Sequence, residues 1–583
     1  MTATMLSLGA PLAELDKPRA IPEGFREVRA TEAEPTPFDA LRDETQRGYA
    51  VFTRAEPGRI YPQSAPARAE VVESLARQAA QGEIADFNFA IHALRELGEL
   101  RVAVSDFVGV YGRIKPDLRL MHCWPQRTGW NSKTYRVVPE LLVRRDSVKL
   151  GAGTTQQYYL TLDVPSNARP GVYKATAAVA TGKGSSIALA LELTVLPFML
   201  NPCPEMVFGL YPDTDNGAKT QAERDIWMRL IARQGFTMAM VYPLDHDEWT
   251  FTGGKVSSTL ANTIGIMEAY KKAGLGGPFI MSLQRFDSHF RKLGVAAPLG
   301  EDGTFSDEAT DVMRQIVRLL KDTGAKRQWP AFIPHGVDEP GKDKAADRAA
   351  WVGKIVRDEG LDYFCTLTRN PGALDATVNV RCMSLIDYTF FRTPEQAAGN
   401  RESTARSGDK FWCYGTGCYV NGSVKQEGNL VSNRYMGGVL LWRAGVSGSL
   451  AWTLMRSHDD PYFDFDGEGT EPKDQCTVYP AIAPDVGFTP TLQWEGLRKG
   501  IDDYRYLGTL ARRIEKARSS NKPAQVAAAS RIEKELAALL GALPWRHVEN
   551  ESQYPDNGLL TNARLDATRA QVVKWILEIG HLP

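Results

Sequence analysis

The chain has no run of roughly 18 apolar residues, the length that a membrane-spanning helix needs, so no such helix is predicted. It also lacks an excess of either charge, because 69 Lys and Arg residues balance 70 Asp and Glu residues, for a formal net charge of -1. With no long block of one sign, the charge pattern does not favour binding to nucleic acid or to an anionic membrane surface. The 43% apolar and 24% charged residues predict a globular protein and exclude a coiled coil or a long disordered chain.

Cysteine and histidine are scarce as well. The seven cysteines are odd in number and scattered, which argues against a disulfide framework. The closest pair, Cys413 and Cys418, has no second pair with which to hold zinc. The eight histidines form no H-x-H or H-E-x-x-H motif, and Gly182 and Lys183 lack the upstream glycine of a phosphate-binding loop. We therefore predict no metal and no cofactor.

The N-terminal residues show little pattern. The first 20 residues lack the basic start of a signal peptide, and Gly9, Pro11 and Glu14 interrupt their apolar stretch. No export signal is therefore evident. Residues 1–65 are rich in Pro, Glu and Arg and have little periodicity, which predicts an extended N-terminal segment.

Residues 66–200 contain short alternating runs separated by turn signals, which predicts a β-sandwich domain. The clearest strand is 187–195, where every second residue is apolar. The runs 158–164 and 172–180 flank a turn rich in proline and predict a hairpin-like pair. Pro197 and the prolines within 201–204 then end the sheet and form a stiff linker, so a domain boundary is expected near residue 200.

Residues 205–518 alternate apolar runs with helical patterns, which predicts a parallel sheet. The expected strands number eight and lie at 206–211, 237–243, 278–283, 330–337, 362–367, 378–384, 410–415 and 447–454. Eight strands favour a closed (β/α)8 barrel of the TIM type. The last barrel helix is expected at 491–518, where one stripe packs inward, formed by Trp494, Leu497, Ile501 and Tyr504. Helical patterns at 523–540 and 561–579 predict a helical C-terminal tail over 519–583, so the fold class is multidomain, all-β followed by α/β.

The active sites of such barrels lie at the C-terminal ends of the strands. The fourth predicted strand ends in His335-Gly-Val-Asp338-Glu339-Pro340. Adjacent carboxylates can converge on one ligand only where a strand ends and its backbone turns, and Pro340 favours such an exit. Because two close carboxylates cannot both ionise freely, one of them can act as a general acid, which suits glycoside hydrolysis. The same residues are also typical of a helix start, with Glu339 near the N-cap and Pro340 at the first helical position.

Further candidates for binding a sugar follow the other predicted strands. Stacking and hydrogen-bonding side chains at this end of the barrel predict a substrate pocket formed by His335, Tyr242, Asp387, Tyr388, Tyr414, Trp452 and Arg434. Trp452 is the strongest of them, because a sugar site needs an apolar floor. Any single one of the others is more often a core or rim residue, and Arg434 is also typical of a solvated or salt-bridged helix face. One acidic loop contains Asp459, Asp460, Asp464 and Asp466. These residues are typical either of a solvated turn or of a calcium site.

Three stretches together resemble glycoside hydrolase family 123 and the wider group of proteins that share its C-terminal domain. Residues 337–340, Val-Asp-Glu-Pro, look like the catalytic Asp–Glu pair of that family at the end of strand four. Residues 492–507 are similar to the signature of its last helix, with the Arg, Gly, Asp-Tyr and Tyr-Leu elements in order. Residues 164–173 resemble the turn in the sandwich that precedes the barrel. The resemblance covers roughly residues 85–515.

The resemblance implies an exo-acting, retaining enzyme similar to β-N-acetylgalactosaminidases. In such enzymes the acetamido oxygen of the substrate itself attacks the anomeric carbon, which is an exception to the scheme with two catalytic carboxylates. Glu339 would then be the general acid/base, and Asp338 would orient the acetamido N–H and stabilise the oxazolinium charge. The implied substrate is an oligosaccharide or glycoconjugate, and the implied location is periplasmic or secreted, although no clear signal peptide is present.

Two alternatives stay open at this point. A glycosidase of another sugar specificity would use Glu339 as the acid and a separate carboxylate, such as Asp387, as the nucleophile. A carbohydrate-binding protein would keep the barrel without turnover. The sequence does not indicate the oligomeric state, and we expect no catalytic residue before position 200.

Overall fold

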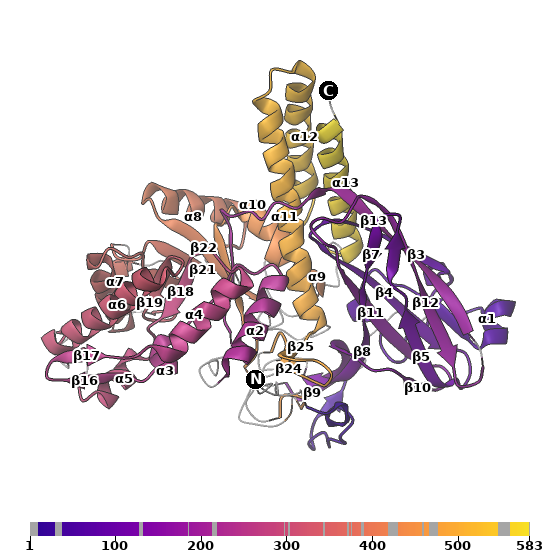
Figure 1. Cartoon of the computed structure of the whole chain (residues 1–583), viewed down its shortest axis with the longest axis horizontal. Coiled ribbons are helices and arrows are strands. Elements are labelled where there is room, and N and C mark those ends of the chain that lie inside the picture. Colours follow the sequence, from indigo (N-terminus) through magenta and orange to yellow (C-terminus); the bar gives the residue numbers. More distant parts are fainter. Residues whose placement is uncertain are drawn as a thin grey trace.

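The computed structural model describes residues 10–28, 38–127, 132–184, 186–212, 219–295, 298–300, 304–341, 344–369, 372–374, 376–385, 390–417, 430–456, 460–463, 465, 476–545 and 560–581. Figure 1 shows a β-rich part built from the first 200 residues beside a second part that carries a sheet surrounded by helices. Long helices near the C-terminus stand between the two parts.

The N-terminal part contains two sheets with one shared hydrophobic core. The first sheet has the order β1-β9-β8-β11-β4-β2, with bounds Arg26–Glu27, Thr134–Val143, Pro116–Arg127, Thr155–Asp163, Ile84–Ala93 and Tyr49–Phe52. The second has the order β10-β5-β12-β13-β3, with bounds Val148–Leu150, Gly98–Val104, Gly171–Thr181, Ser186–Met199 and Ser74–Gln81. A small hairpin extends it through β6 (Phe107–Gly109) and β7 (Gly112–Ile114). In β13 the predicted alternation is present, because Leu189, Leu191, Leu193 and Val195 are buried.

Two predictions for this part were wrong. The runs 158–164 and 172–180 do not pair, because β11 lies between β8 and β4 whereas β12 lies between β5 and β13. The proline-rich turn between them therefore carries the chain from one sheet to the other. Residues 1–65 are also not simply an extended segment: α1 spans Arg42–Arg47, and the fully buried β2 pairs with β4. A four-residue strand is too short to show a period, which is why composition alone missed it.

The second part contains all eight predicted strands. They form one parallel sheet in the order β15-β14-β23-β22-β21-β20-β19-β18, with bounds Met238–Ala239, Val207–Leu210, Gly448–Trp452, Lys410–Gly417, Val380–Ser384, Phe364–Leu367, Phe332–His335 and Phe279–Ser282. A parallel bridge between Val241 and Met281 links the two outer strands. The sheet therefore nearly closes into a barrel, and its strands run as apolar segments buried on both faces.

Helices follow most barrel strands. The longer ones are α2 (Gln221–Arg233), α4 (Ala261–Ala273), α6 (Asp307–Arg327), α7 (Lys344–Asp358) and α8 (Pro394–Arg406). Shorter helical segments are α3 (Pro243–His246), α5 (Phe286–Lys292), α9 (Leu430–Arg434) and α10 (Leu440–Ala444). Between β20 and β21 the described residues form only a 3-10 turn at Gly372–Leu374, so the regular (β/α)8 alternation is interrupted there.

The last barrel helix, α11 (Leu492–Arg518), packs closely on residues 430–444. A π-helical turn, Tyr435–Val439, joins α9 to α10. A Cβ on Gly438 would collide with the carbonyl group of Gly500, and a Cβ on Gly500 would collide with the backbone of Arg434. These two glycines therefore allow the helix backbones to touch.

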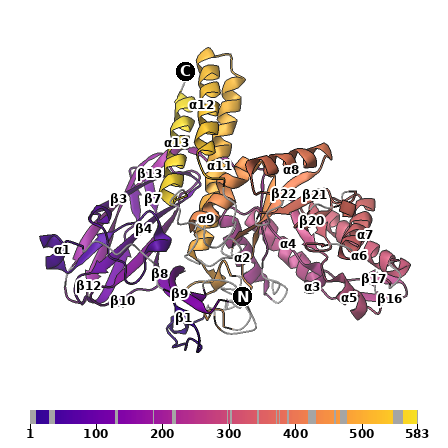
Figure 2. The ribbon, with the colours of Figure 1, turned by 180° about the vertical axis from the view of Figure 1, so that it is seen from behind.

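The C-terminal helices were predicted close to their observed bounds, α12 at Pro523–Gly541 and α13 at Asn562–His581. Figure 2, the view from behind, shows α13 between the N-terminal sheets and the pair α11 and α12. Within the described ranges, no helix has the length and apolar character needed to cross a bilayer. Nor do these ranges hold a group of three or more His, Cys, Asp or Glu side chains placed to bind a metal ion. Cys418 lies outside the described residues.

Candidate active site

Asp338 and Glu339 lie just past the C-terminal end of β19, the fourth barrel strand. Both are exposed, and the Asp338 side chain keeps 50% of its accessible surface. Glu339 has a φ of 41°, a left-handed conformation that is costly for a residue with a side chain and is concentrated at functional sites. Pro340 and Gly341 precede α7 and are not helical, so the prediction of Pro340 as the first helical residue was wrong. The pair belongs to the barrel rim.

Thr366, on the neighbouring strand β20, joins the two acids. Its hydroxyl donates to Asp338 Oδ1 over 2.7 Å and accepts from the backbone N–H of Glu339 over 2.8 Å. Thr366 is 1% exposed, so its hydroxyl is shielded from water. Sequence reasoning missed it. The only signal was a hydroxyl residue close to the end of the fifth strand.

Tyr414, on β22, donates a hydrogen bond from its hydroxyl to Glu339 Oε1. Burial, together with the hydrogen bond to Glu339 and its charge, holds the pKa of Tyr414 well above its usual range. The phenol therefore stays a donor at every physiological pH. Tyr414 lies at this end of the barrel, and its predicted contact with substrate stays a prediction.

His335 lies beneath the acid pair and is fully buried. Its Nε2 is 3.0 Å from the carbonyl of Val337, and its Nδ1 is 3.2 Å from the amide nitrogen of Gln284. Burial lowers the pKa of His335, so its ring is neutral near pH 7, with Nε2 as donor and Nδ1 as acceptor in this network. His335 supports the turn at 336–338 from inside the barrel, and because its ring is fully buried the prediction that it binds substrate was wrong.

A cavity of about 160 Å³ opens beside Asp338. It is lined by Tyr211, Pro212, Tyr242, Asp245, Gln284, Arg285, Asp338, Trp452, Thr453, Met455 and Arg456. Trp452 meets Tyr211 edge-on, with ring centroids 5.0 Å apart, so two aromatic side chains form an apolar wall. Tyr242 and Trp452 were predicted for this place. No sequence pattern indicated Gln284, Arg285 or Arg456 as lining residues.

Three other candidates have different outcomes. Asp387 and Tyr388 lie outside the described residues, as do the loop acids Asp459, Asp464 and Asp466. The prediction that Arg434 binds substrate was wrong. Arg434 is fully buried on α9, where its guanidinium pairs with Asp503 over 2.7 Å and with Asp566 over 2.6 Å.

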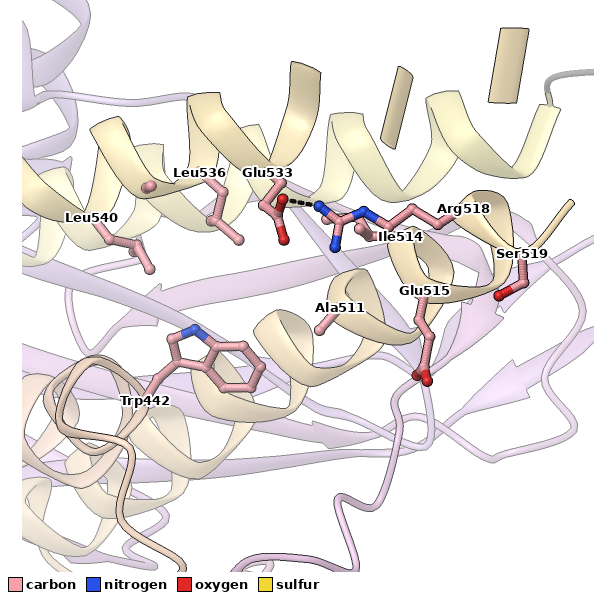
Figure 3. A pocket seen from close by; sticks show the side chains of 10 residues that line it. Trp442, Ala511, Ile514, Glu515, Arg518, Ser519, Glu533, Leu536 and Leu540 are labelled. Atoms are coloured by element: carbon pink, nitrogen blue, oxygen red, sulfur yellow. Dashed lines mark hydrogen bonds and ion pairs between the residues drawn. The ribbon is translucent and has the colours of Figure 1, made fainter. Parts of the chain in front are cut away.

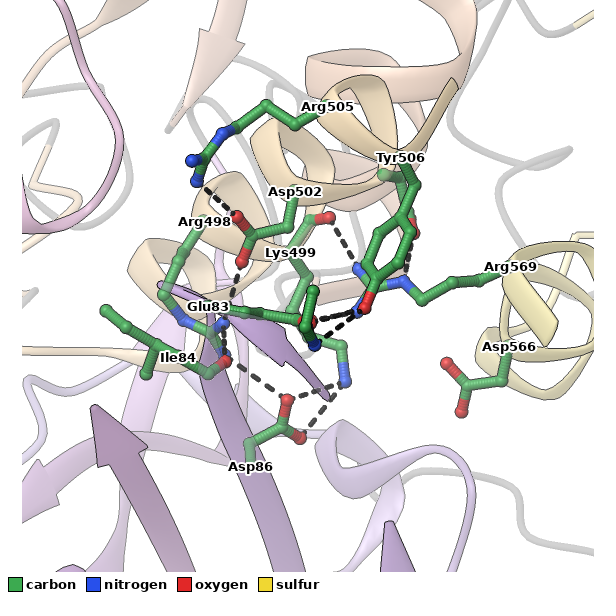
Figure 4. Close-up of polar contacts among 12 residues, drawn as sticks. Glu83, Ile84, Asp86, Arg498, Lys499, Asp502, Arg505, Tyr506, Asp566 and Arg569 are labelled. Atoms are coloured by element: carbon green, nitrogen blue, oxygen red, sulfur yellow. Dashed lines mark hydrogen bonds and ion pairs between the residues drawn. The ribbon is translucent and has the colours of Figure 1, made fainter. Parts of the chain in front are cut away.

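Arg434 belongs to a buried ion-pair network around α11, drawn in part in Figure 4. Within it Arg498 contacts Glu495, Asp86 and Asp502, and Arg569 on α13 contacts Glu83 and Asp503. Burial raises the pKa of Asp503, but the charges of Arg434 and Arg569 outweigh it, so the net pKa is lowered. Burial raises the pKa of Glu83. The network joins the N-terminal sheets, the barrel and the tail.

Two larger hollows lie away from the acid pair. One, of about 450 Å³, is a mostly apolar groove between α11 and α12 that Trp442 helps to line (Figure 3). The other, of about 420 Å³, borders the network of Figure 4 and is lined by Lys499 and Arg569 among others. Neither is lined by Asp338 or Glu339. Cavity volume alone would therefore not select the acid pair.

The fold and this rim define a barrel protein with paired carboxylates at the strand ends. No known family and no curated protein matches the sequence. Among solved structures, a family 123 glycoside hydrolase from Clostridium perfringens, studied for glycolipid glycan hydrolysis, is similar with a TM-score of 0.65 and 14% identity. The match covers 91% of this chain and 98% of that chain.

The chain therefore has the fold of that family 123 glycoside hydrolase, and the resemblance seen in the sequence is confirmed at this level. Two other solved structures match more weakly. A GH5 xyloglucanase from Bacteroides ovatus has a TM-score of 0.30 and 10% identity over 75% of this chain and 99% of its own. The pneumococcal virulence factor StrH has a TM-score of 0.31 and 12% identity, over 64% of this chain and 98% of its own.

Proposed function

We propose that this protein is a retaining, exo-acting glycoside hydrolase that removes a terminal 2-acetamido sugar by substrate-assisted catalysis. The observation that carries the proposal is the acid pair at the end of β19, with Asp338 held by Thr366 and Glu339 held by Tyr414. The aromatic wall of Tyr211 and Trp452 beside Asp338 suits the apolar face of a sugar ring. The fold shared with a family 123 glycoside hydrolase supports it.

In the first step the acetamido carbonyl oxygen forms a bond to the anomeric carbon while the glycosidic C–O bond breaks. Protonated Glu339 gives its proton to the leaving oxygen, so the aglycone departs as a neutral alcohol. Asp338 accepts a hydrogen bond from the acetamido N–H and offsets the positive charge of the oxazolinium. Tyr414 donates to the Glu339 carboxylate that this step leaves behind.

In the second step a water molecule attacks the anomeric carbon and reopens the oxazolinium ring. Glu339 now takes the proton from that water, and the electron pair of the ring C–O bond returns to the acetamido group. The sugar is released with its original anomeric configuration, because two inversions have occurred. No cofactor enters this scheme.

The dimensions of the cavity support exo action. Its volume of about 160 Å³ is well below the ~300 Å³ at which ordinary ligand pockets begin, and suits one sugar ring better than an extended chain. The remainder of an oligosaccharide or glycoconjugate would then lie outside. We further propose that residues 66–200 form a supporting β-sandwich domain, that 205–518 form the catalytic domain, and that 519–583 form a helical extension.

One observation favours a second candidate, a glycosidase with its own nucleophile. Asp245 also lines the cavity, and His289 Nε2 lies 3.3 Å from its Oδ1. Burial raises the pKa of Asp245, but the hydrogen bond and charge of His289 outweigh it, so the net pKa is lowered and the carboxylate is ionised. An ionised carboxylate beside Asp338 is the group that direct attack on a sugar would need.

Hydrolysis rates of two matched sets of substrates distinguish the two candidate mechanisms. We expect p-nitrophenyl glycosides with a 2-acetamido group to be hydrolysed and the matching 2-hydroxy sugars not to be. Efficient cleavage of the 2-hydroxy sugars, or a fluoro-sugar ester trapped on Asp245, would favour the second candidate. Binding of these sugars without turnover of any of them would leave a carbohydrate-binding protein.

A further inference from the structure

The small hairpin on the seven-stranded sheet carries an exposed apolar patch. β6 pairs with β12 on one side and β7 on the other, so Val108 lies opposite Lys174 and Arg113. Gly109 lies opposite Tyr173, so the turn residue Val110 and the strand residue Val172 each come directly after one member of this pair. The three valines are 53%, 89% and 43% exposed, in the order Val108, Val110, Val172.

Tyr111, at 62% exposure, completes this patch, which we call the hairpin patch. Val110 and Tyr111 occupy the two turn positions between paired Gly109 and Gly112, where hairpins ordinarily place Asn, Asp or Gly. Among the described residues seven large apolar side chains are exposed, and four of them are in the hairpin patch. Such clustering marks an interaction surface, whereas single exposed apolar residues do not.

The hairpin is held in one position. A Cβ on Gly109 would stand 2.8 Å from the ring of Tyr173, so the backbone rests directly on that ring. The hydroxyl of Tyr173 donates to the carbonyl of Arg169 over 3.0 Å. The Arg169 guanidinium in turn lies 4.8 Å from the ring centroid of Tyr111. A cation thus covers one face of Tyr111, which makes this ring a poor platform for a sugar.

We propose that the hairpin patch docks onto a membrane surface that contains anionic lipid. Four side chains are too few for a stable protein interface of about 800 Å² per partner, whereas a few aliphatic and aromatic side chains suffice at a bilayer interface. Three basic side chains border the patch, namely Arg113 and Lys174 opposite Val108 and Arg169 over the Tyr111 ring. Asp106 pairs with Arg113 and Glu192 pairs with Lys174, so the positive charge of Arg169 is in excess. This local excess attracts anionic headgroups, although the net charge of the chain does not reveal it.

Sedimentation with lipid vesicles tests the proposal. We expect the protein to bind vesicles of phosphatidylcholine and phosphatidylglycerol at 7:3, and at least tenfold more weakly to phosphatidylcholine alone. The double variant Val110→Asp/Tyr111→Ser should lose at least tenfold in binding to the mixed vesicles. Met199→Asp, which changes an exposed apolar residue on β13 outside the patch, should bind as wild type does.

The proposal is independent of catalysis, because binding is measured without substrate. The proposal is overturned if the wild-type protein stays in the supernatant when the mixed vesicles are pelleted. It is also overturned if the double variant, shown to be folded by circular dichroism, still binds these vesicles. It is equally overturned if size-exclusion chromatography shows a dimer that the double variant dissociates, since the patch would then bind a second copy.

A second inference concerns Thr366 and rests on the proposed function. One hydroxyl holds both the Asp338 carboxylate and the backbone of Glu339, at 2.7 and 2.8 Å, and the Glu339 backbone is in the left-handed region. The geometry points to Thr366 as a positioning residue that keeps the two carboxyl groups in register for catalysis. It acts through both acids and does not itself meet the substrate in the scheme above.

Thr366→Val removes the hydroxyl and preserves the shape, and Thr366→Ser retains the hydroxyl. We expect Thr366→Val to lower kcat about 30-fold while KM changes less than threefold. We expect the kcat of Thr366→Ser to stay within threefold of wild type. Equal kcat values for Val and wild type, or a Ser variant as slow as Val at equal folded content, would overturn it. If wild type cleaves no 2-acetamido sugar, the proposed function has failed instead.

Discussion

The acid pair at the barrel rim and the ion-pair network on α11 are both clusters of carboxylates with polar partners, but they differ in burial. Asp338 is 50% exposed and is held by a threonine, whereas Asp503 and Arg434 are buried and neutralise each other. A carboxylate open to solvent can meet a substrate and exchange a proton. A charge sealed among opposite charges can do neither, and its role is to fix how the parts of the molecule join.

The longer sequence signature belongs to the network. The segment 492–507, which carried most of the family resemblance, supplies Arg498, Asp502 and Asp503 to buried pairs. The catalytic candidates occupy only two positions at 338–339. In this chain the longer motif therefore marks a structural junction, and the proposed catalytic pair is a short motif that many proteins contain.

The largest expected effect comes from Glu339→Gln, which removes the proton donor without changing the shape of the side chain. Turnover of a 2-acetamido glycoside should fall about 10³-fold or more. Unfolding by heat should be unchanged, because Glu339 is exposed. Glu308→Gln, at an exposed site on α6, is the matched control. Activity of Glu339→Gln within threefold of wild type would remove Glu339 from the mechanism.

Substitutions in the buried ion-pair network should lower the stability of the fold, in contrast to Glu339→Gln, which should lower turnover. Arg498→Ala leaves Glu495, Asp502 and Asp86 without their shared cation in a buried place, which costs about 3–5 kcal/mol of unfolding free energy. Urea denaturation measures this loss. Arg518→Ala, at the end of α11, breaks an exposed ion pair with Glu533 on α12 and should cost below about 1 kcal/mol of unfolding free energy. Similar losses for the two variants would contradict the contrast in burial.

Asp338→Asn tests the other member of the rim pair. Its amide can no longer offset the oxazolinium charge, so kcat should fall about 10²-fold while KM changes little. A thiazoline analogue of the cyclised intermediate should bind the wild-type protein more tightly than substrate does. Steady-state kinetics and competition assays measure both. A rise in KM with unchanged kcat would assign Asp338 to ground-state binding instead.

Tyr414→Phe should have a smaller effect. It removes one hydrogen bond to Glu339 Oε1 and keeps the ring, so turnover should fall about tenfold. Stability should change by less than about 1.5 kcal/mol. Parallel assays of kcat and of the urea midpoint separate the two effects. A stability loss without any change in turnover would place Tyr414 in the core and outside the site.

The smallest expected effect is the pH dependence of the stability that Asp503 contributes to the ion-pair network. The pKa of Asp503 is lowered in the folded protein, so its contribution to stability is fully present above pH 4 and is lost as pH falls toward its folded pKa. The gap in unfolding free energy between wild type and Asp503→Asn should therefore narrow as pH falls below about 4. Denaturation midpoints over this range measure the gap, and a gap independent of pH would contradict the ionised state of Asp503.

Much of the fold was predictable because the signals were local. Each barrel strand is an apolar run that ends at turn residues. In β13 apolar residues alternate with other residues along the sequence of the strand itself. Partner choice is not local, which is why the chain segments around the 165–170 turn were paired wrongly. The same holds for the site. The end of strand four predicted Asp338 and Glu339, but only the strand order brings Thr366 and Tyr414 to them, and only the fold shows that Arg434 faces Asp503, 69 positions away.

The contact between Arg569 and Glu83 joins residues that are 486 positions apart. A ribosome makes the chain from the N-terminus, so Glu83 emerges long before the helix that neutralises it. Until α13 has been synthesised, the buried pocket for Arg569 holds carboxylates without that cation. The N-terminal sheets can form early, but their attachment to the barrel is completed only after α13 has been synthesised. Ribosome-bound chains that stop before residue 560 should thus expose this junction to protease, and released chains that include α13 should protect it.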